Sequence, residues 1–176
     1  MIEKEFTIIE PKKSIFIKIV LALILATYTT IVYYFLNKED FTNYIIKLLL
    51  LTLVVFNWMV IPYLSRKSIH LNFSHKKIKY EQRIGPISIK KKWKTLKNLK
   101  YISVFSTENG YEVNLWHSKN KIINLFVDED IEAVVEKAFF FAEKLEIDLL
   151  DARERGYHRW INKTIYRQTN KIEYID

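Results

Sequence analysis

The sequence predicts an α+β membrane protein in which an N-terminal transmembrane helical hairpin precedes a small, curved antiparallel sheet or barrel closed by one C-terminal helix. Three observations lead to this fold class. Two long apolar stretches fill the first 64 residues, short runs with alternating hydrophobic residues follow over 68–128, and a helical hydrophobic pattern covers 128–152. About 20 apolar residues suffice for a helix to cross a bilayer, whereas period-two alternation is typical of half-buried strands.

Composition separates the two halves of the chain. The 176 residues are 49% hydrophobic with a net charge of +8, which argues against disorder. Most of the excess charge lies in residues 65–176, which hold 22 Lys and Arg against 15 Asp and Glu. Cysteine is absent, which excludes disulfides and thiolate chemistry, and only three glycines occur.

The predicted spans are residues 14–36 and 44–64. The first contains one charge, Lys18, close enough to its start for the ammonium group to reach the interface. Two soluble interpretations compete, namely a signal peptide for the first stretch or a pair of buried core helices. A signal peptide needs a short apolar region followed by a small-residue cleavage site, and neither is present.

Flanking charges predict the orientation of the hairpin. The link at 37–43 has a net charge of −1, whereas Arg66 and Lys67 follow the second span directly. Because positive residues concentrate on the cytoplasmic side, we expect an inner-membrane protein with both termini in the cytoplasm. Asn57, inside the second span, is a candidate helix–helix contact with another subunit, although it can also bond within its own hairpin or lie near enough to the interface to bond water.

Six strands are expected in the soluble part, joined by short turns. Glu108-Asn109-Gly110 and Lys119-Asn120 have the composition of tight hairpin turns. A sheet of this size must curl to bury its apolar face. The six expected strands are residues 68–73, 77–84, 87–95, 99–107, 111–118 and 121–128.

The last predicted element of the domain is a helix over 128–152. Asp128 or Asp130 can cap its start, and hydrophobic residues at helical spacing form a stripe that would cover the sheet. Phe140 and Ile147 fall opposite this stripe, so Phe140 is either exposed or covered by another segment.

This order of elements resembles the pleckstrin-homology-like domains of bacterial membrane proteins, in which a two-helix hairpin precedes a curved sheet and one helix. The segments that carry the resemblance are "SIHLNFSHKKIKYEQRIGPISIKKKWKTLKNLKYISVF", "NGYEVNLW", "KIINLFVDED" and "AVVEKAFFFAEKLEIDLLDA". It implies a binding or assembly module without an assigned enzyme activity. The expected organisation is a cytoplasmic segment at 1–13, the hairpin at 14–64, the domain at 65–152 and a basic amphipathic tail at 153–176.

The segment 77–100 is strongly basic, with Glu81 as its only acid. Period-two geometry places three cations outward on each of two strands, and a connector at 65–67 spans only about 10 Å, so this wall is expected at the bilayer surface. Anionic lipids are the preferred partner. Solubility of an edge strand, nucleic acid and an acidic protein are the alternatives, with nucleic acid disfavoured. The predicted wall consists of Lys77, Lys79, Arg83, Lys90, Lys92 and Lys94.

The tail contributes further candidate contacts. Its expected helix places Trp160 on an apolar face, with Arg159 and Lys163 on the others. Such a helix can lie in the membrane interface, dock on a partner or fold back over Phe140.

The sequence offers no catalytic or metal-binding motif. The four histidines are dispersed, and no nucleophile elbow, Walker loop or dinucleotide fingerprint occurs. We therefore expect a non-enzymatic protein without cofactor or metal that binds the lipid surface or a membrane-associated protein. The alternative is an accessory subunit of a larger membrane complex. The oligomeric state is left open.

Overall fold

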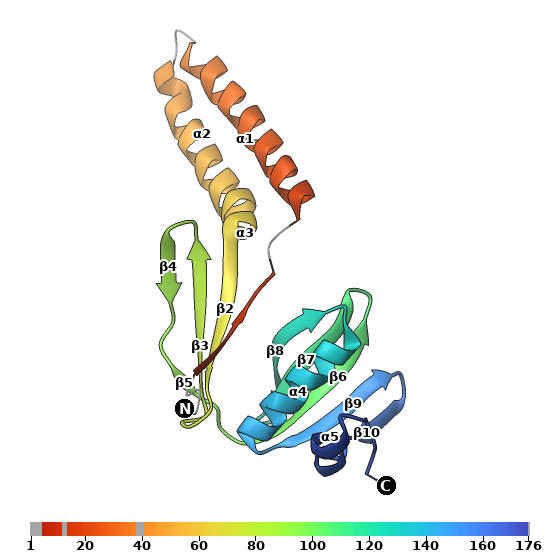
Figure 1. Cartoon of the computed structure of the whole chain (residues 1–176). Coiled ribbons are helices and arrows are strands. Elements are labelled where there is room, and N and C mark those ends of the chain that lie inside the picture. The colour runs from red at the N-terminus through yellow and green to blue at the C-terminus, as the bar shows by residue number, and fades with distance from the viewer. Residues whose placement is uncertain (1–4, 12–13, 38–40, 176) are drawn as a thin grey trace. The chain divides into compact units, whose positions relative to one another are not determined.

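The structure is a computed structural model that describes residues 5–11, 14–37 and 41–175 (Figure 1). The chain divides into two compact units whose segments alternate along the sequence. The β-rich unit comprises the segment up to Ile8, Ile69–Tyr80 and the chain from Lys91 onward, and the helical unit comprises Ile9–Ser68 and Glu81–Lys90. These units do not coincide with the consecutive segments 14–64, 65–152 and 153–176 that the sequence suggested.

The helical unit contains two apolar helices that run antiparallel. The hydroxyls of Tyr28 and Thr52 are 2.6 Å apart, and the rings of Phe35 and Tyr44 are 5.0 Å apart. Residue numbers thus rise along one helix as they fall along the other, which is the geometry of a hairpin. The helices are α1 (Ile15–Leu36) and a continuous second helix formed by α2 (Phe41–Val54), the π-helical η1 (Val55–Val60) and α3 (Ile61–Leu64).

The π-helical turn in the second helix has a local cause. Pro62 has no N–H group, so it cannot donate to the carbonyl four residues earlier. The Ile61 N–H donates instead to the Phe56 carbonyl, five residues back, as in a π-bulge. The helix ends when Ser65 adopts an extended conformation.

The first sheet begins earlier in the sequence than expected. Its first strand, β1, precedes the helices, and Glu10 exchanges hydrogen bonds with Lys67 just beyond that strand. The second strand, β2, starts at Ser65, so residues expected to form a connector at 65–67 are already strand. The order is β1-β2-β3-β4, with β5 paired to β3. The strands are β1 (Glu5–Ile9), β2 (Ser65–Asn72), β3 (Lys77–Ile84), β4 (Ile87–Lys90) and β5 (Lys94–Thr95).

The second sheet is mixed and lies entirely in the β-rich unit. Its order is β10-β9-β6-β7-β8, and β9 runs parallel to β6. The predicted turn before Gly110 is present. Glycine is required at position 110, because φ there is +115° and a Cβ atom would lie 2.6 Å from the Asp128 carbonyl oxygen. The strands are β6 (Leu99–Thr107), β7 (Gly110–His117), β8 (Lys121–Asp128), β9 (Asp148–Glu154) and β10 (Tyr157–Trp160).

The helix after β8 is shorter than expected. Helix α4 covers Ile131–Leu145, capped by the Asp130 carboxylate on the Glu132 and Ala133 N–H groups. Glu146 then takes a left-handed conformation, and residues predicted to continue the helix to 152 form β9 instead. Pairing of β9 with β6 is a long-range contact that local periodicity does not encode. The helix is therefore not the last element, since β10 and the short α5 (Lys163–Thr169) follow.

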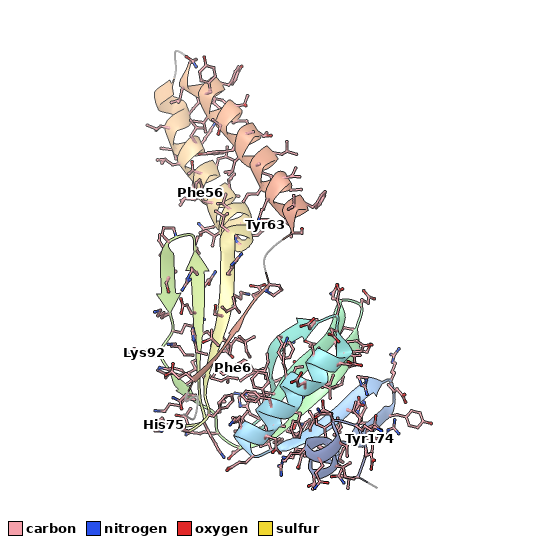
Figure 2. All side chains as sticks on the ribbon, viewed as in Figure 1. Phe6, Phe56, Tyr63, His75, Lys92 and Tyr174 are labelled. Atoms are coloured by element: carbon pink, nitrogen blue, oxygen red, sulfur yellow. The ribbon has the colours of Figure 1, made fainter. Side chains whose placement is uncertain are left out.

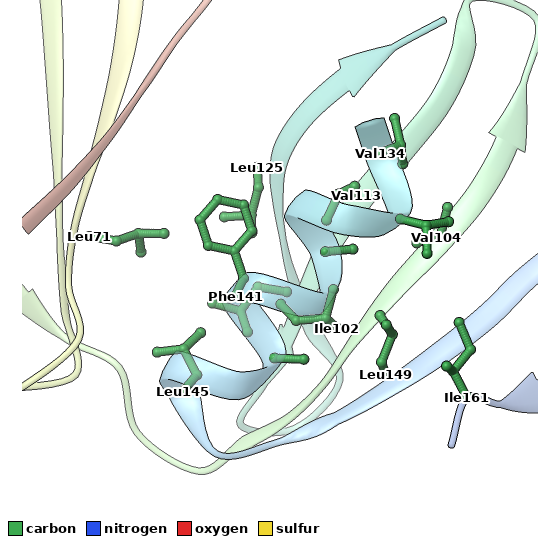
Figure 3. Packing of buried hydrophobic residues seen from close by; sticks show 14 of the residues in the cluster. Leu71, Ile102, Val104, Val113, Leu125, Val134, Phe141, Leu145, Leu149 and Ile161 are labelled. Carbon is green, nitrogen blue, oxygen red and sulfur yellow. The ribbon is translucent and has the colours of Figure 1, made fainter. Parts of the chain in front are cut away.

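The core of the β-rich unit lies between α4 and the sheets (Figure 3). Phe141 and Leu145 of α4 are buried against strand residues such as Ile102 and Val113. The first sheet contributes Leu71, and the tail contributes Ile161. Segments far apart in the sequence therefore help to bury one helix. The protein is confirmed as α+β with two apolar N-terminal helices.

Candidate functional site

Both N-terminal helices are long and apolar enough to cross a membrane. Large apolar side chains on both are exposed, including Leu23 at 64% and Leu50 at 58%, whereas core helices of a soluble protein would be mostly buried. The Thr27, Thr29 and Thr30 hydroxyls each donate to the carbonyl four residues earlier in α1. These three hydroxyls thus have partners within their own helix, as a lipid environment requires.

The Asn57 side chain forms a hydrogen bond within its own helix. Its amide nitrogen donates to the Leu53 carbonyl at 3.1 Å, and the side chain is exposed on the π-helical turn. Of the two interpretations drawn from sequence, bonding within the hairpin is therefore the one observed. Contact with a second protein at Asn57 remains a proposal.

In the helical unit, Arg83 and Lys90 lie on one face of the β3–β4 hairpin. The pairs Glu81↔Lys90 and Arg83↔Ser88 place all four side chains on that face. Glu81 is buried, and its carboxylate accepts hydrogen bonds from Arg83 at 3.1 Å and from Ser88 at 2.8 Å. Its negative charge lies among these cations and offsets part of their charge.

The basic residues of the β-rich unit do not share one wall. The pairs Lys77↔Thr95 and Ile78↔Lys94 place Lys77 and Lys94 on opposite faces of the sheet. The prediction was wrong for Lys94 because pairing with β3 shifts by one residue between β4 and β5, which inverts the alternation.

The two remaining predicted wall residues lie near that shift in pairing. The Lys79 ammonium nitrogen lies over the Trp93 ring, 4.6 Å from its centre. Lys92 is exposed on the segment between β4 and β5 (Figure 2).

Phe140 is covered by β1 and by the turn that follows β2. Its ring centre lies 5.4 Å from that of Phe6 and 5.8 Å from that of Phe73, within the same unit. The Lys144 ammonium nitrogen is 5.7 Å from the ring centre. The sequence left open whether Phe140 is exposed or covered by another segment. It is covered, and part of the cover is β1, a strand that the sequence analysis did not predict.

The tail folds back onto the β-rich unit, but along β9 and Phe139 and not over Phe140. Its first part is the strand β10, paired with β9, so the expected continuous helix from 157 is wrong. Tyr166 of α5 packs its ring 4.7 Å from that of Phe139. Lys163 and Arg167 both pair with Glu143. Burial raises the pKa of Glu143, but these hydrogen bonds outweigh it, and the pKa is lowered.

Arg159 and Trp160 point to opposite sides of β10. The Arg159 guanidinium carbon lies over the Tyr174 ring, 3.8 Å from its centre. The Trp160 ring is 40% exposed and meets Tyr101 edge to face, with centres 5.3 Å apart. Tyr101 in turn stacks on Trp116 at 5.4 Å, which forms an aromatic row that the sequence analysis missed.

A polar cluster around Asp151 was also missed. The Asp151 carboxylate is buried and accepts hydrogen bonds from Arg153 Nε at 2.8 Å, from Arg153 Nη2 at 2.6 Å and from the Tyr174 hydroxyl at 2.9 Å. Burial raises the pKa of Asp151, but these bonds outweigh it, and the pKa is lowered. The same ion pair raises the pKa of Arg153. An Asp-x-Arg spacing in a strand is the only local signal, since Tyr174 lies 23 residues away.

The Asp151 cluster lines a cavity of about 200 Å³. Two arginines there, Arg153 and Arg159, are balanced by Asp151 and Glu154. Within residues 5–11, 14–37 and 41–175, no group of His, Asp or Glu is arranged to hold a metal ion. Comparisons of the chain with protein-family models, with curated proteins and with solved structures found no match.

Proposed function

We propose that this chain is a membrane-anchored, non-enzymatic protein whose β-rich part binds the anionic surface of the cytoplasmic (inner) membrane or a protein at that surface. One observation carries the proposal. The second apolar helix ends at Leu64, and β2 begins at the next residue, Ser65. A sheet that starts at the end of a membrane span begins within the headgroup layer.

A pleckstrin-homology-like fold is part of this proposal. It is supported by the antiparallel meander β6-β7-β8 followed by α4, which matches the expected order of sheet and helix. The strands β9 and β10 and helix α5 are additions to that pattern.

Basic residues supply the attraction to lipid. Arg66 and Lys67 open β2, and Lys90 ends β4 in the same helical unit. A basic residue near an anionic leaflet contributes about 1 kcal/mol, and the attraction falls off within a Debye length. Arg66 and Lys67 also favour a cytoplasmic position for both ends of the hairpin.

The membrane topology can be tested with single-cysteine variants, because the natural chain has no cysteine. We expect I175C to react with a membrane-impermeant maleimide in inverted membrane vesicles and to be protected in intact spheroplasts. Recovery of the full chain in the soluble fraction, or labelling from the outer side, would contradict the proposal.

The lipid preference can be tested on the full chain in nanodiscs. A fluorophore on the β-rich unit at K119C should transfer energy to headgroup acceptors more efficiently in anionic than in neutral lipid, and salt should reduce the difference. K90E/K92E should weaken the transfer. The matched control K97E/K100E changes the net charge equally within the same basic segment, and an equal effect of both variants would contradict a role for the β3–β5 lysines.

A second candidate, an accessory subunit of a membrane complex, is favoured by the aromatic row Trp116-Tyr101-Trp160. Aromatic side chains with part of their surface exposed are enriched at protein interfaces. Purification in mild detergent would then recover stoichiometric partners, and W160A would reduce their recovery. A single protein in every preparation would argue against this candidate.

A further inference from the structure

The tip of the β3–β4 hairpin carries two exposed isoleucines. Ile87 is 63% exposed and Ile89 is 53% exposed, on a strand of four residues at the edge of the sheet. Edge strands of soluble proteins usually carry charge or proline there to prevent pairing with other chains. Two exposed aliphatic side chains at an edge therefore indicate that another surface covers them.

Chain topology places this tip beside the end of the second apolar helix. Strand β2 leaves that helix at Ser65, turns at residues 73–76, and β3 returns along β2 to end at Ile84. The turn Gly85-Pro86 therefore lies at the end of the sheet from which the helix departs, and both belong to the helical unit (Figure 1).

Distances along the chain put the tip within the lipid headgroup layer. The headgroup layer on each side of a bilayer is roughly 5–7 Å thick. A strand advances about 3.3 Å per residue. If Leu64 ends the membrane span, Ser65 lies at the start of this layer. The two-residue turn Gly85-Pro86, at the same end of the sheet, then lies within the layer as well.

The two faces of the hairpin differ in the way that an interfacial segment requires. The pairs Ile84↔Ile87 and Gln82↔Ile89 place the three isoleucines on one face. The opposite face carries Arg83, Ser88 and Lys90 around the buried carboxylate of Glu81. Aliphatic side chains on one side and cations on the other suit the boundary between acyl chains and anionic headgroups.

We propose that the β3–β4 hairpin is an interfacial anchor, in which Ile87 and Ile89 insert among the lipid headgroups beside the end of the second helix. This inference rests on the proposed membrane anchoring. The occupant is the lipid interface, because the apolar face lies at the end of the sheet from which a membrane-length helix departs, and the opposite face carries cations. The hairpin gives the β-rich part a second attachment that does not depend on anionic lipid.

The test uses the full chain in vesicles of phosphatidylcholine, with or without phosphatidylglycerol, and an environment-sensitive fluorophore on single cysteines. Labels at I87C and I89C should show blue-shifted emission and strong quenching by doxyl lipids in both lipid mixtures and at high salt. A label at S88C, between them on the opposite face, should show weaker quenching. Ile87 and Ile89 are exposed, so these substitutions remove little packing.

A label at R66C separates failure of this inference from failure of the proposed function. Quenching at R66C without quenching at I87C and I89C would overturn the interfacial anchor while leaving the membrane span intact. Absence of quenching at all four positions would overturn both. A blue shift at I87C and I89C that grows with protein density, without quenching by doxyl lipids, would show pairing with a second copy and overturn the proposal.

Discussion

At the scale of single residues, Asp151 is a buried carboxylate that needs hydrogen bonds and a positive charge to remain ionised. Its carboxylate is buried and lies between Arg153 and Tyr174. Tyr174 belongs to the C-terminal segment, where Ile175 donates to the Trp160 carbonyl. Asp151 therefore links β9 to the last residues of the chain.

Replacing Asp151 should destabilise the tail in a pH-dependent manner. At neutral pH, D151N should lower the free energy of unfolding by about 1.5–3 kcal/mol, the range for hydrogen bonds to charged groups. Because the folded pKa is lowered, this stabilisation is present above the ordinary carboxyl pKa of about 3.9 and is lost as pH falls through the folded value. Hydrogen exchange of β10 amides against pH measures the difference.

The control is D148N, which changes an exposed acid at the start of the same strand. It should leave exchange of β10 unchanged. If D151N lowers the stability of β10 by the same amount at low pH as at neutral pH, the packing of the side chain, and not its charge, stabilises the tail.

At the scale of elements, β1 completes the hydrophobic core. Phe6 meets Phe140 and Phe141 with ring centres 5.4 and 5.2 Å apart. The same three rings contact Phe73, in the turn that follows β2. The five-residue strand β1 thus covers Phe140, on the side of α4 for which the sequence analysis predicted no contact within the sheet.

Double-mutant analysis can test this contact. F6A and F140A should each reduce the stability of the β-rich unit by about 1–3 kcal/mol, less than for a fully buried Phe because Phe140 is half-buried. Their coupling energy should be about 0.5–1.5 kcal/mol. Hydrogen exchange of α4 amides in the full chain provides the free energies.

F105A is a suitable comparison, since Phe105 contacts His158 in the second sheet. F6A and F105A should be additive. Additivity of F6A with F140A would instead mean that β1 does not pack on α4 in solution.

At the scale of the whole molecule, the apolar helices are an insertion between two neighbouring strands. The chain passes from β1 into α1 and returns from α3 into β2, which pairs with β1. The β-rich unit therefore depends on segments from both sides of the hairpin. Residues 65–152 alone lack Phe6, Ile161 and Tyr166 of the core.

Fragments should therefore behave differently from the full chain. We expect residues 68–152 to aggregate or to lack protected amides, because the edge of β9 and the aromatic cluster lose their covers. A chain in which a short flexible linker replaces residues 14–62 should remain folded. Far-UV circular dichroism and amide exchange distinguish these outcomes, and a well-folded 68–152 fragment would contradict the dependence on β1 and the tail.

The sequence by itself determined the elements whose pattern is local. Residues 77–84, 99–107 and 121–128 form strands with the expected bounds, and the apolar stretches form helices, because side-chain periodicity and length dictate these conformations. Tertiary structure decided the rest. Leu149 and Leu150 continue a helical pattern, yet they form β9, since Glu146 ends the helix and β6 offers a parallel partner. Strand β1, the face of Lys94 and the Asp151 cluster likewise depend on pairing between residues far apart in the chain, which no local pattern records.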